Sequence, residues 1–207
     1  MIFMKRLVWP VLCLMPLGLL AQDPKDQIPL IDSPLAAQPI GVVDKLEYHA
    51  KRVVDPGFFL AAGAAAGFQQ LYNKPPEWGQ GAAGYGRRYG SAFGANVARE
   101  VVGFGLDSLL HEDPRFFRLG RGDFMARSGS ALVQVAVTHT DSGGRSLAVW
   151  RIGGAFGAGF ISNAWRPPSQ NKASDAMVFG GLALAYDGAR NIFMEFWPDI
   201  KRKLLKK

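Results

Sequence analysis

The residues best suited to chemistry form one short polar run, His111, Glu112 and Asp113, followed by Arg115. An imidazole beside two carboxylates is a common combination in metal sites and in acid/base catalysis. Consecutive residues do not share a helix face, however, and a lone histidine lacks the regularly spaced partners of zinc sites. We therefore favour a structural interpretation, in which His111 ends a helix and nearby arginines pair with the local acids. A hydrolytic site near His111 is kept as the alternative.

A second pattern, G-x-G-x-x-G at Gly79 to Gly84, is typical of dinucleotide-binding turns. That chemistry needs a β-strand immediately before the pattern, so that a helix N-terminus faces the pyrophosphate. The preceding residues include Pro75 and Pro76, which do not suit a buried central strand. The other histidines, His49 and His139, lie in different segments, and no serine occupies a G-x-S-x-G turn. The sequence therefore identifies no catalytic residue, no cofactor-binding residue and no metal ligand.

Small residues repeat at intervals of four along several segments of the chain. Residues four apart lie on one face of a helix, where small side chains let another backbone approach closely. Glycine inside a helix costs about 1 kcal/mol relative to alanine, so close helix contact must return that free energy. Such packing is common between helices in membranes. The predicted helix-packing positions are Gly63, Gly67, Gly86, Gly90, Gly94, Gly153, Gly157, Gly181 and Ala185.

Proline and helix-capping signals divide the chain into helical segments. A short amphipathic helix is expected over residues 42–54, and five further helices over 57–72, 77–111, 124–140, 147–165 and 176–197. Asp123 and Ser146 are the candidate N-caps of two of them. The β-branched residues of 131–140 suit a strand equally well. We predict an all-α fold, a bundle of about five helices packed through glycine and alanine faces.

The beginning of the chain has the composition of an export signal. Lys5 and Arg6 precede an uncharged apolar stretch, and Ala21 offers a small residue for cleavage. We expect a signal peptide over residues 1–21, a proline-rich leader over 22–55 and a glycine- and alanine-rich domain with a basic tail over 56–207. The only cysteine, Cys13, lies in the signal, so the exported chain would use neither disulfides nor thiol chemistry.

Several runs resemble a family of uncharacterised exported glycine-rich proteins of environmental bacteria. The resemblance covers residues 56–203 and implies an exported helical protein, with no activity, substrate, cofactor or site residue. The runs that carry it are 76–81, 85–90, 111–118, 162–163 and 195–200.

Together these features predict an exported, non-enzymatic protein of the periplasm or outer membrane. We expect it to associate with a membrane or cell-envelope surface, or with copies of itself, through its glycine-rich helices. The whole chain carries a net charge of +7, yet nucleic acid is not an expected partner for an exported protein. The alternative is a soluble periplasmic protein that binds a small molecule or carries the hydrolytic site near His111.

Overall fold

The computed structural model describes residue 31 and residues 38–205. The signal predicted for residues 1–21, and the leader up to residue 37 apart from Ile31, lie outside the described residues. Within the described part the chain forms six α-helices, which confirms the predicted all-α bundle. They are α2 (Val42–Val54), α3 (Pro56–Leu71), α4 (Gly81–Leu110), α5 (Phe124–Ala136), α6 (Val149–Ser162) and α7 (Ala173–Leu205).

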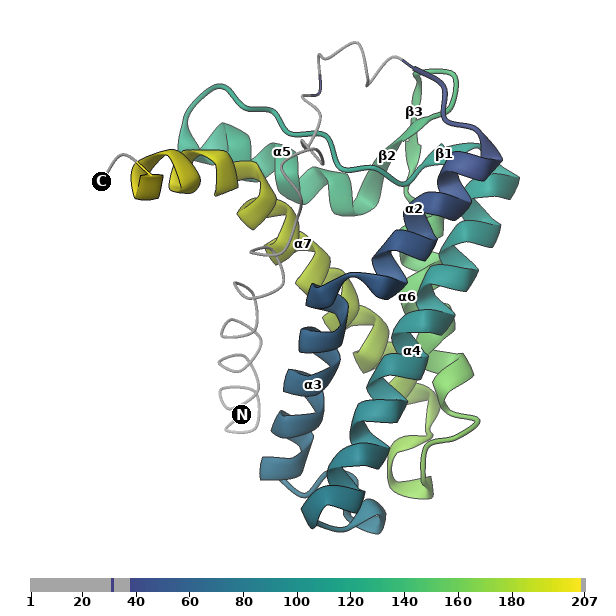
Figure 1. Ribbon diagram of the computed structural model, residues 1–207. Coiled ribbons are helices and arrows are strands. Elements are labelled where there is room, and N and C mark those ends of the chain that lie inside the picture. The colour runs from purple at the N-terminus through teal and green to yellow at the C-terminus, as the bar shows by residue number, and fades with distance from the viewer. Residues whose placement is uncertain (1–30, 32–37, 206–207) are drawn as a thin grey trace.

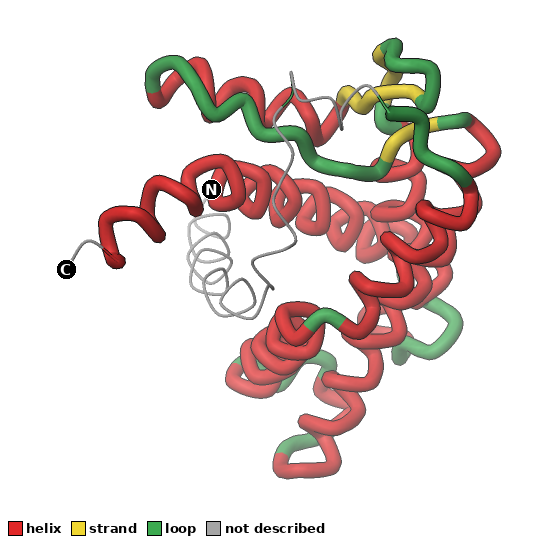
Figure 2. The backbone as a smooth tube through the Cα atoms, turned by 45° about the horizontal axis from the view of Figure 1, so that its top comes forward, coloured by secondary structure: helices red, strands yellow, loops and turns green. Residues whose placement is uncertain are grey.

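The long helix α4 is the centre of the bundle (Figure 1). It packs against α6, α3 and α2, while α7 packs against α6 and α5. α2, which the sequence assigned to the leader, is therefore part of the packed domain. Two short 3-10 helices, η1 (Pro76–Trp78) and η2 (Pro168–Gln170), lie in the turns before α4 and α7. Both views place α5 beside the C-terminal half of α7, whose end extends away from α4 (Figure 1 and Figure 2).

A small antiparallel sheet closes one end of the bundle, in the order β1 (Glu112–Asp113), β2 (Val137–Thr140) and β3 (Arg145–Leu147). Asp113 pairs with His139, and Thr138 pairs with Ser146. The ambiguous segment 131–140 is thus divided between two structures. It is helical up to Ala136 and extended from there on.

The two predicted N-caps have different outcomes. Asp123 caps α5, since its carboxylate accepts a hydrogen bond of 2.7 Å from the Ala126 amide. The prediction for Ser146 is wrong, because Ser146 lies within β3 and α6 starts after Ala148. The sequentially distant Glu112 takes its place, because its carboxylate accepts hydrogen bonds from the first amides of α6.

Candidate functional site

The most polar part of the interior is centred on His49 of α2, whose ring lies between two carboxylates of α4. Nδ1 lies 2.7 Å from Glu100 Oε2, and Nε2 lies 2.8 Å from Asp107 Oδ2. All three side chains are buried. A neutral imidazole has only one N–H, so both contacts are hydrogen bonds only when the ring is protonated. Burial acts to lower the pKa of His49, but the hydrogen bonds and charges of Asp107 and Glu100 outweigh it and raise that pKa.

This buried ion network continues from Glu100 through Arg52, whose Nε donates a hydrogen bond of 3.0 Å to Glu100 Oε1. Burial opposes ionisation of Glu100, but the positive charge of Arg52 and the bond from His49 lower its pKa to about 2. A second pair joins Arg99 of α4 to Asp187 of α7. The negative charge of Asp187 is shared with Arg151 of α6, at 4.0 Å. The buried ion network therefore links α2, α4, α6 and α7.

The surroundings of His49 are aromatic and closely packed. The rings of Tyr48, Phe104 and Trp150 meet the imidazole edge-on, with centroids 5.2 to 6.1 Å away. A Cβ added to Gly103 would lie 3.2 Å from the imidazole. Among the described residues, no group of three or more His, Cys, Asp or Glu side chains is arranged to hold a metal ion. The arrangement therefore holds the charges of His49, Glu100 and Asp107 in a fixed geometry between α2 and α4.

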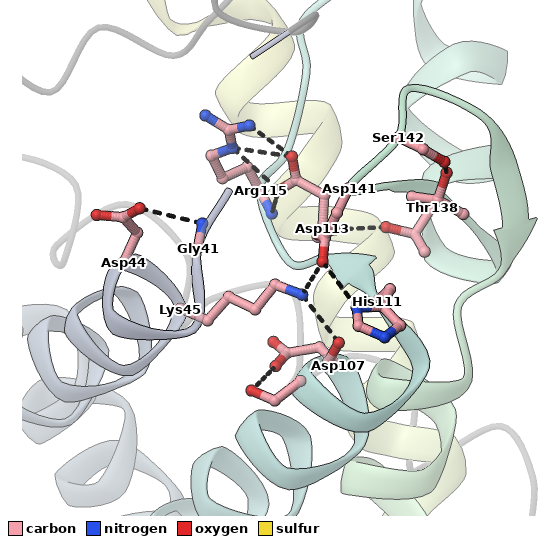
Figure 3. A network of polar contacts seen from close by, with 12 residues as sticks. Gly41, Asp44, Lys45, Asp107, His111, Asp113, Arg115, Thr138, Asp141 and Ser142 are labelled. Atoms are coloured by element: carbon pink, nitrogen blue, oxygen red, sulfur yellow. Dashed lines mark hydrogen bonds and ion pairs between the residues drawn. The ribbon is translucent and has the colours of Figure 1, made fainter. Parts of the chain in front are cut away.

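The polar run singled out in the sequence lies at the end of the bundle that carries the sheet (Figure 3). His111 adopts a left-handed conformation with φ of 55° and ends α4, and its side chain is 79% exposed. The carboxylate of Glu112 accepts a hydrogen bond from the Trp150 amide at the N-terminus of α6. Asp113 accepts hydrogen bonds from the backbone and the guanidinium of Arg115. The three side chains thus serve separate partners and do not converge on one point.

Lys45 of α2 connects this region to the helices. Its Nζ donates hydrogen bonds of 2.7 Å to Asp141 Oδ2 and 2.9 Å to the carbonyl oxygen of Asp107 (Figure 3). His111 Nδ1 lies 3.6 Å from the same Asp141 oxygen. The Lys45 side chain is buried. Its two hydrogen bonds therefore tie α2 to the C-terminal end of α4 and to the loop after β2.

The predicted helix-packing glycines fall into two groups. A Cβ added at Gly63, Gly94, Gly153 or Gly157 would contact a side chain of a neighbouring segment, at 2.4 to 3.5 Å. At Gly67, Gly86, Gly90 and Gly181 nothing lies within 4 Å, and Ala185 is exposed. Two further glycines make the closest backbone contacts of α6. A Cβ would lie 3.1 Å from the Arg99 carbonyl oxygen at Gly154, and 2.5 Å from the Ala176 carbonyl oxygen at Gly159.

Many large apolar side chains lie on the outside, although Phe116, Phe117, Trp150 and Met194 are buried. On α2 the exposed face carries Val43, which is 77% exposed, and Leu46, whereas Lys45 and His49 point inward. We call the exposed apolar residues of α2, α3, α4 and α6, together with those in the first half of α7, the outer apolar surface. It comprises Val42, Val43, Leu46, Val54, Phe59, Leu60, Leu71, Tyr85, Val101, Leu109, Leu110, Phe160, Ile161, Met177, Val178 and Leu182.

The interior between α4, α6 and α7 contains small and charged residues. Ala95, Ala155 and Ala158 are fully buried there, and Arg99 and Asp187 are buried beside them. Proteins folded in water usually place their large apolar side chains inside and bury charges only as exceptions. Within residues 38–205, no helix combines the length and apolarity needed to cross a bilayer.

Fold and site therefore define the chain as a small α-helical bundle with a buried ion network and many exposed apolar side chains. No protein-family model, no curated protein and no solved structure matches it.

The buried ion network was missed at the sequence level, although a signal for it exists. Lys45, His49 and Arg52 follow one another at intervals of four and three, which places them on one face of α2. Such a polar face is ordinarily assigned to solvent. Only the partners on α4, Glu100 and Asp107, which are themselves seven residues apart, reveal that this face is buried.

Proposed function

We propose that the protein is an exported, non-enzymatic envelope protein that associates with a lipid surface through its outer apolar surface. The observation that carries the proposal is the combination of a buried ion network with many exposed large apolar side chains. Ionisable residues of helices in an apolar medium face the bundle interior and pair with one another. Small residues at helix contacts belong to the same mode of packing.

The energetic argument is clearest on α2. Val43 and Leu46 lie in water in the free protein while Lys45 and His49 are dehydrated. Covering a large apolar side chain contributes about 1.5–3 kcal/mol relative to leaving it exposed. A lipid surface would cover the exposed apolar side chains of α2 and leave its buried ion pairs unchanged.

Association at the membrane surface fits better than a span. α3 is the least polar helix, with no charged residue from Pro56 to Leu71. Many of its residues are alanine and glycine, however, which contribute little apolar surface for insertion into a bilayer. A helix lying in the interface needs only one apolar face, buried to about 5–10 Å. Phe59 and Leu60 give α3 such a face.

Flotation with lipid vesicles tests the proposal on the protein isolated from cells, with its N-terminus determined by mass spectrometry. We expect the wild-type protein to float with vesicles of phosphatidylcholine and phosphatidylglycerol, and V43Q/L46Q to float less. E47Q/K51Q is a matched control, because it removes an exposed ion pair of the same helix and keeps the apolar side chains. Equal flotation of all three proteins would show that Val43 and Leu46 of the outer apolar surface do not bind lipid. Failure of the wild-type protein to float would refute lipid association.

Association with a second copy is the competing explanation of the same surface. Light scattering without lipid separates the two. A stable oligomer that V43Q/L46Q disperses would assign the outer apolar surface to self-association, and the lipid proposal would then fall.

A further inference from the structure

We infer that one end of the molecule is a docking site for an anionic lipid surface, an inference that rests on the lipid association proposed above. The site, which we call the tip, consists of Phe124 and Met125 at the start of α5 together with residues 200–205 at the end of α7. It joins exposed apolar side chains to a cluster of cations.

The two helices of the tip are held firmly together. Arg127 of α5 donates hydrogen bonds of 2.8 Å to Glu195 Oε1 and 2.7 Å to the Glu195 carbonyl oxygen, both on α7. Its Nη1 lies 2.7 Å from Asp199 Oδ2. Phe124 stacks on Phe196 with ring centroids 5.2 Å apart. Because these contacts fix α5 against α7, Phe124 and Met125 stay beside the end of α7.

The apolar side chains of the tip are exposed. Met125 is 75% exposed and Phe124 64%, although Phe124 stacks on Phe196. On α7, Phe196, Ile200 and Leu204 follow at intervals of four, so they form one line along the helix. This line runs from the contact with Phe124 towards the helix end, where Leu204 is exposed.

The charged part of the tip has one sign. Residues 201–207 read KRKLLKK and contain no acid. Of the nearby acids, Asp199 is paired with Arg127 and Arg202, and Asp123 caps α5. Lys201 and Lys203 make no ion pair among the described residues. The tip therefore keeps uncompensated positive charge next to its apolar side chains.

Cations at a helix C-terminus are also favoured by the helix dipole, which would explain residues 201–203 without any ligand. The dipole does not explain why Leu204 and Leu205 are exposed between lysines. Nor does it explain why a second helix brings Phe124 and Met125 to the same place. Insertion of apolar side chains combined with attraction of cations to anionic headgroups accounts for both, and stable anchoring takes two such signals.

The test compares binding of the isolated protein to vesicles of phosphatidylcholine alone and of phosphatidylcholine with phosphatidylglycerol. Each basic residue near an anionic surface strengthens binding by about fivefold. K201Q/K203Q should therefore weaken binding to the mixed vesicles by roughly 30-fold and leave binding to phosphatidylcholine unchanged. Salt should weaken wild-type binding to the mixed vesicles, because it screens exposed charges.

K74Q/K172Q is the matched control, since it removes the same charge from exposed lysines away from the tip. Lys172 precedes α7, whose 33 residues separate it from the tip by about 50 Å. Unchanged binding of this control, with loss in K201Q/K203Q, supports the inference. L204Q/L205Q should weaken binding to both kinds of vesicle, and circular dichroism should show the helices intact.

The outcomes separate the two proposals. Equal losses in K201Q/K203Q and K74Q/K172Q would overturn the inference, because net charge and not the tip would govern binding. Equal binding of the wild-type protein to both vesicles would also overturn it, while lipid association itself would stand. Binding to neither vesicle would refute the proposed function and the inference together.

Discussion

Replacing His49 by leucine should destabilise the protein strongly, because it leaves two buried carboxylates without their shared partner. Glu100 would keep Arg52 at 3.0 Å. The fully buried Asp107 would keep only a hydroxyl contact, from Ser108 Oγ at 3.3 Å, among its described side-chain hydrogen bonds. Removing one member of a buried ion pair typically costs about 3–5 kcal/mol. Because domains are stable by only about 5–15 kcal/mol, this loss is a large fraction of the total.

The pH dependence of this loss has a definite sign. The pKa of His49 is raised in the folded protein, so its contribution is fully present below the unfolded pKa of about 6.5. The contribution disappears as the pH rises through the folded pKa. The pKa of Glu100 is lowered to about 2, so its contribution is present above the unfolded pKa and is lost as the pH falls through about 2. Wild type should therefore be most stable between pH about 4.5 and 6.5 as far as these two groups decide it.

Urea unfolding followed by circular dichroism measures both effects. We expect the difference in unfolding free energy between wild type and His49→Leu to be largest below pH about 6.5, and to shrink in alkaline solution. His111→Asn is the control, because that imidazole is exposed and asparagine tolerates the left-handed backbone of this position, so stability should change by less than about 0.5 kcal/mol. His49→Leu combined with Asp107→Leu should recover part of the loss, since it removes the stranded charge. A loss no greater than that of His111→Asn, or one independent of pH, would refute the charged His49.

Four further substitutions test other parts of the fold by thermal or urea unfolding. Arg88→Lys should cost about 2–4 kcal/mol, because the buried guanidinium donates to three backbone carbonyls around η1 that one ammonium cannot reach together; a cost below 1 kcal/mol would contradict this role. Gly159→Ala should cost about 1–3 kcal/mol, because its Cβ would lie 2.5 Å from the Ala176 carbonyl oxygen. Gly86→Ala should instead stabilise by up to about 1 kcal/mol, and shifts of the same sign in both glycine variants would be inconsistent with the packing described. Glu112→Gln should cost about 1–2 kcal/mol through loss of the charged cap of α6, and an unchanged unfolding midpoint would rule that cap out.

The helices were predictable from the sequence because their ends are set by local chemistry. The expected helix over 42–54 coincides with α2, and Asp123 caps α5 as predicted. Where an end depends on a distant residue the prediction failed. Ser146 has a suitable side chain for a cap, but the amides of α6 are met by Glu112, more than thirty residues earlier in the chain. The strand after Ala136 likewise forms because β1 and β3 are present to pair with it.

The candidate site was less predictable, because an amphipathic helix has two faces and periodicity alone does not say which one is buried. Hydrophobicity would place Val43 and Leu46 of α2 inside, and the structure places Lys45 and His49 there. The glycines have the same ambiguity. A row such as Gly86 and Gly90 has the spacing of a helix contact, yet it faces open space, whereas Gly159 has the contact.

The buried charges and the glycine packing occur at the same helix contacts. Gly154 and Gly159 bring the backbone of α6 so close to α4 and α7 that no larger side chain fits at these two positions, and Ala155 and Ala158 of the same helix are fully buried. Alanine buries little apolar area, so this interior gains less from the hydrophobic effect than one of leucine or phenylalanine. Directional ion pairs such as Arg99 with Asp187 supply the specificity of contact that alanine lacks. Large apolar side chains such as Val43 and Leu46 of α2 lie outside, and covering them with an apolar medium lowers the free energy. This arrangement is the physical basis of the lipid association proposed above.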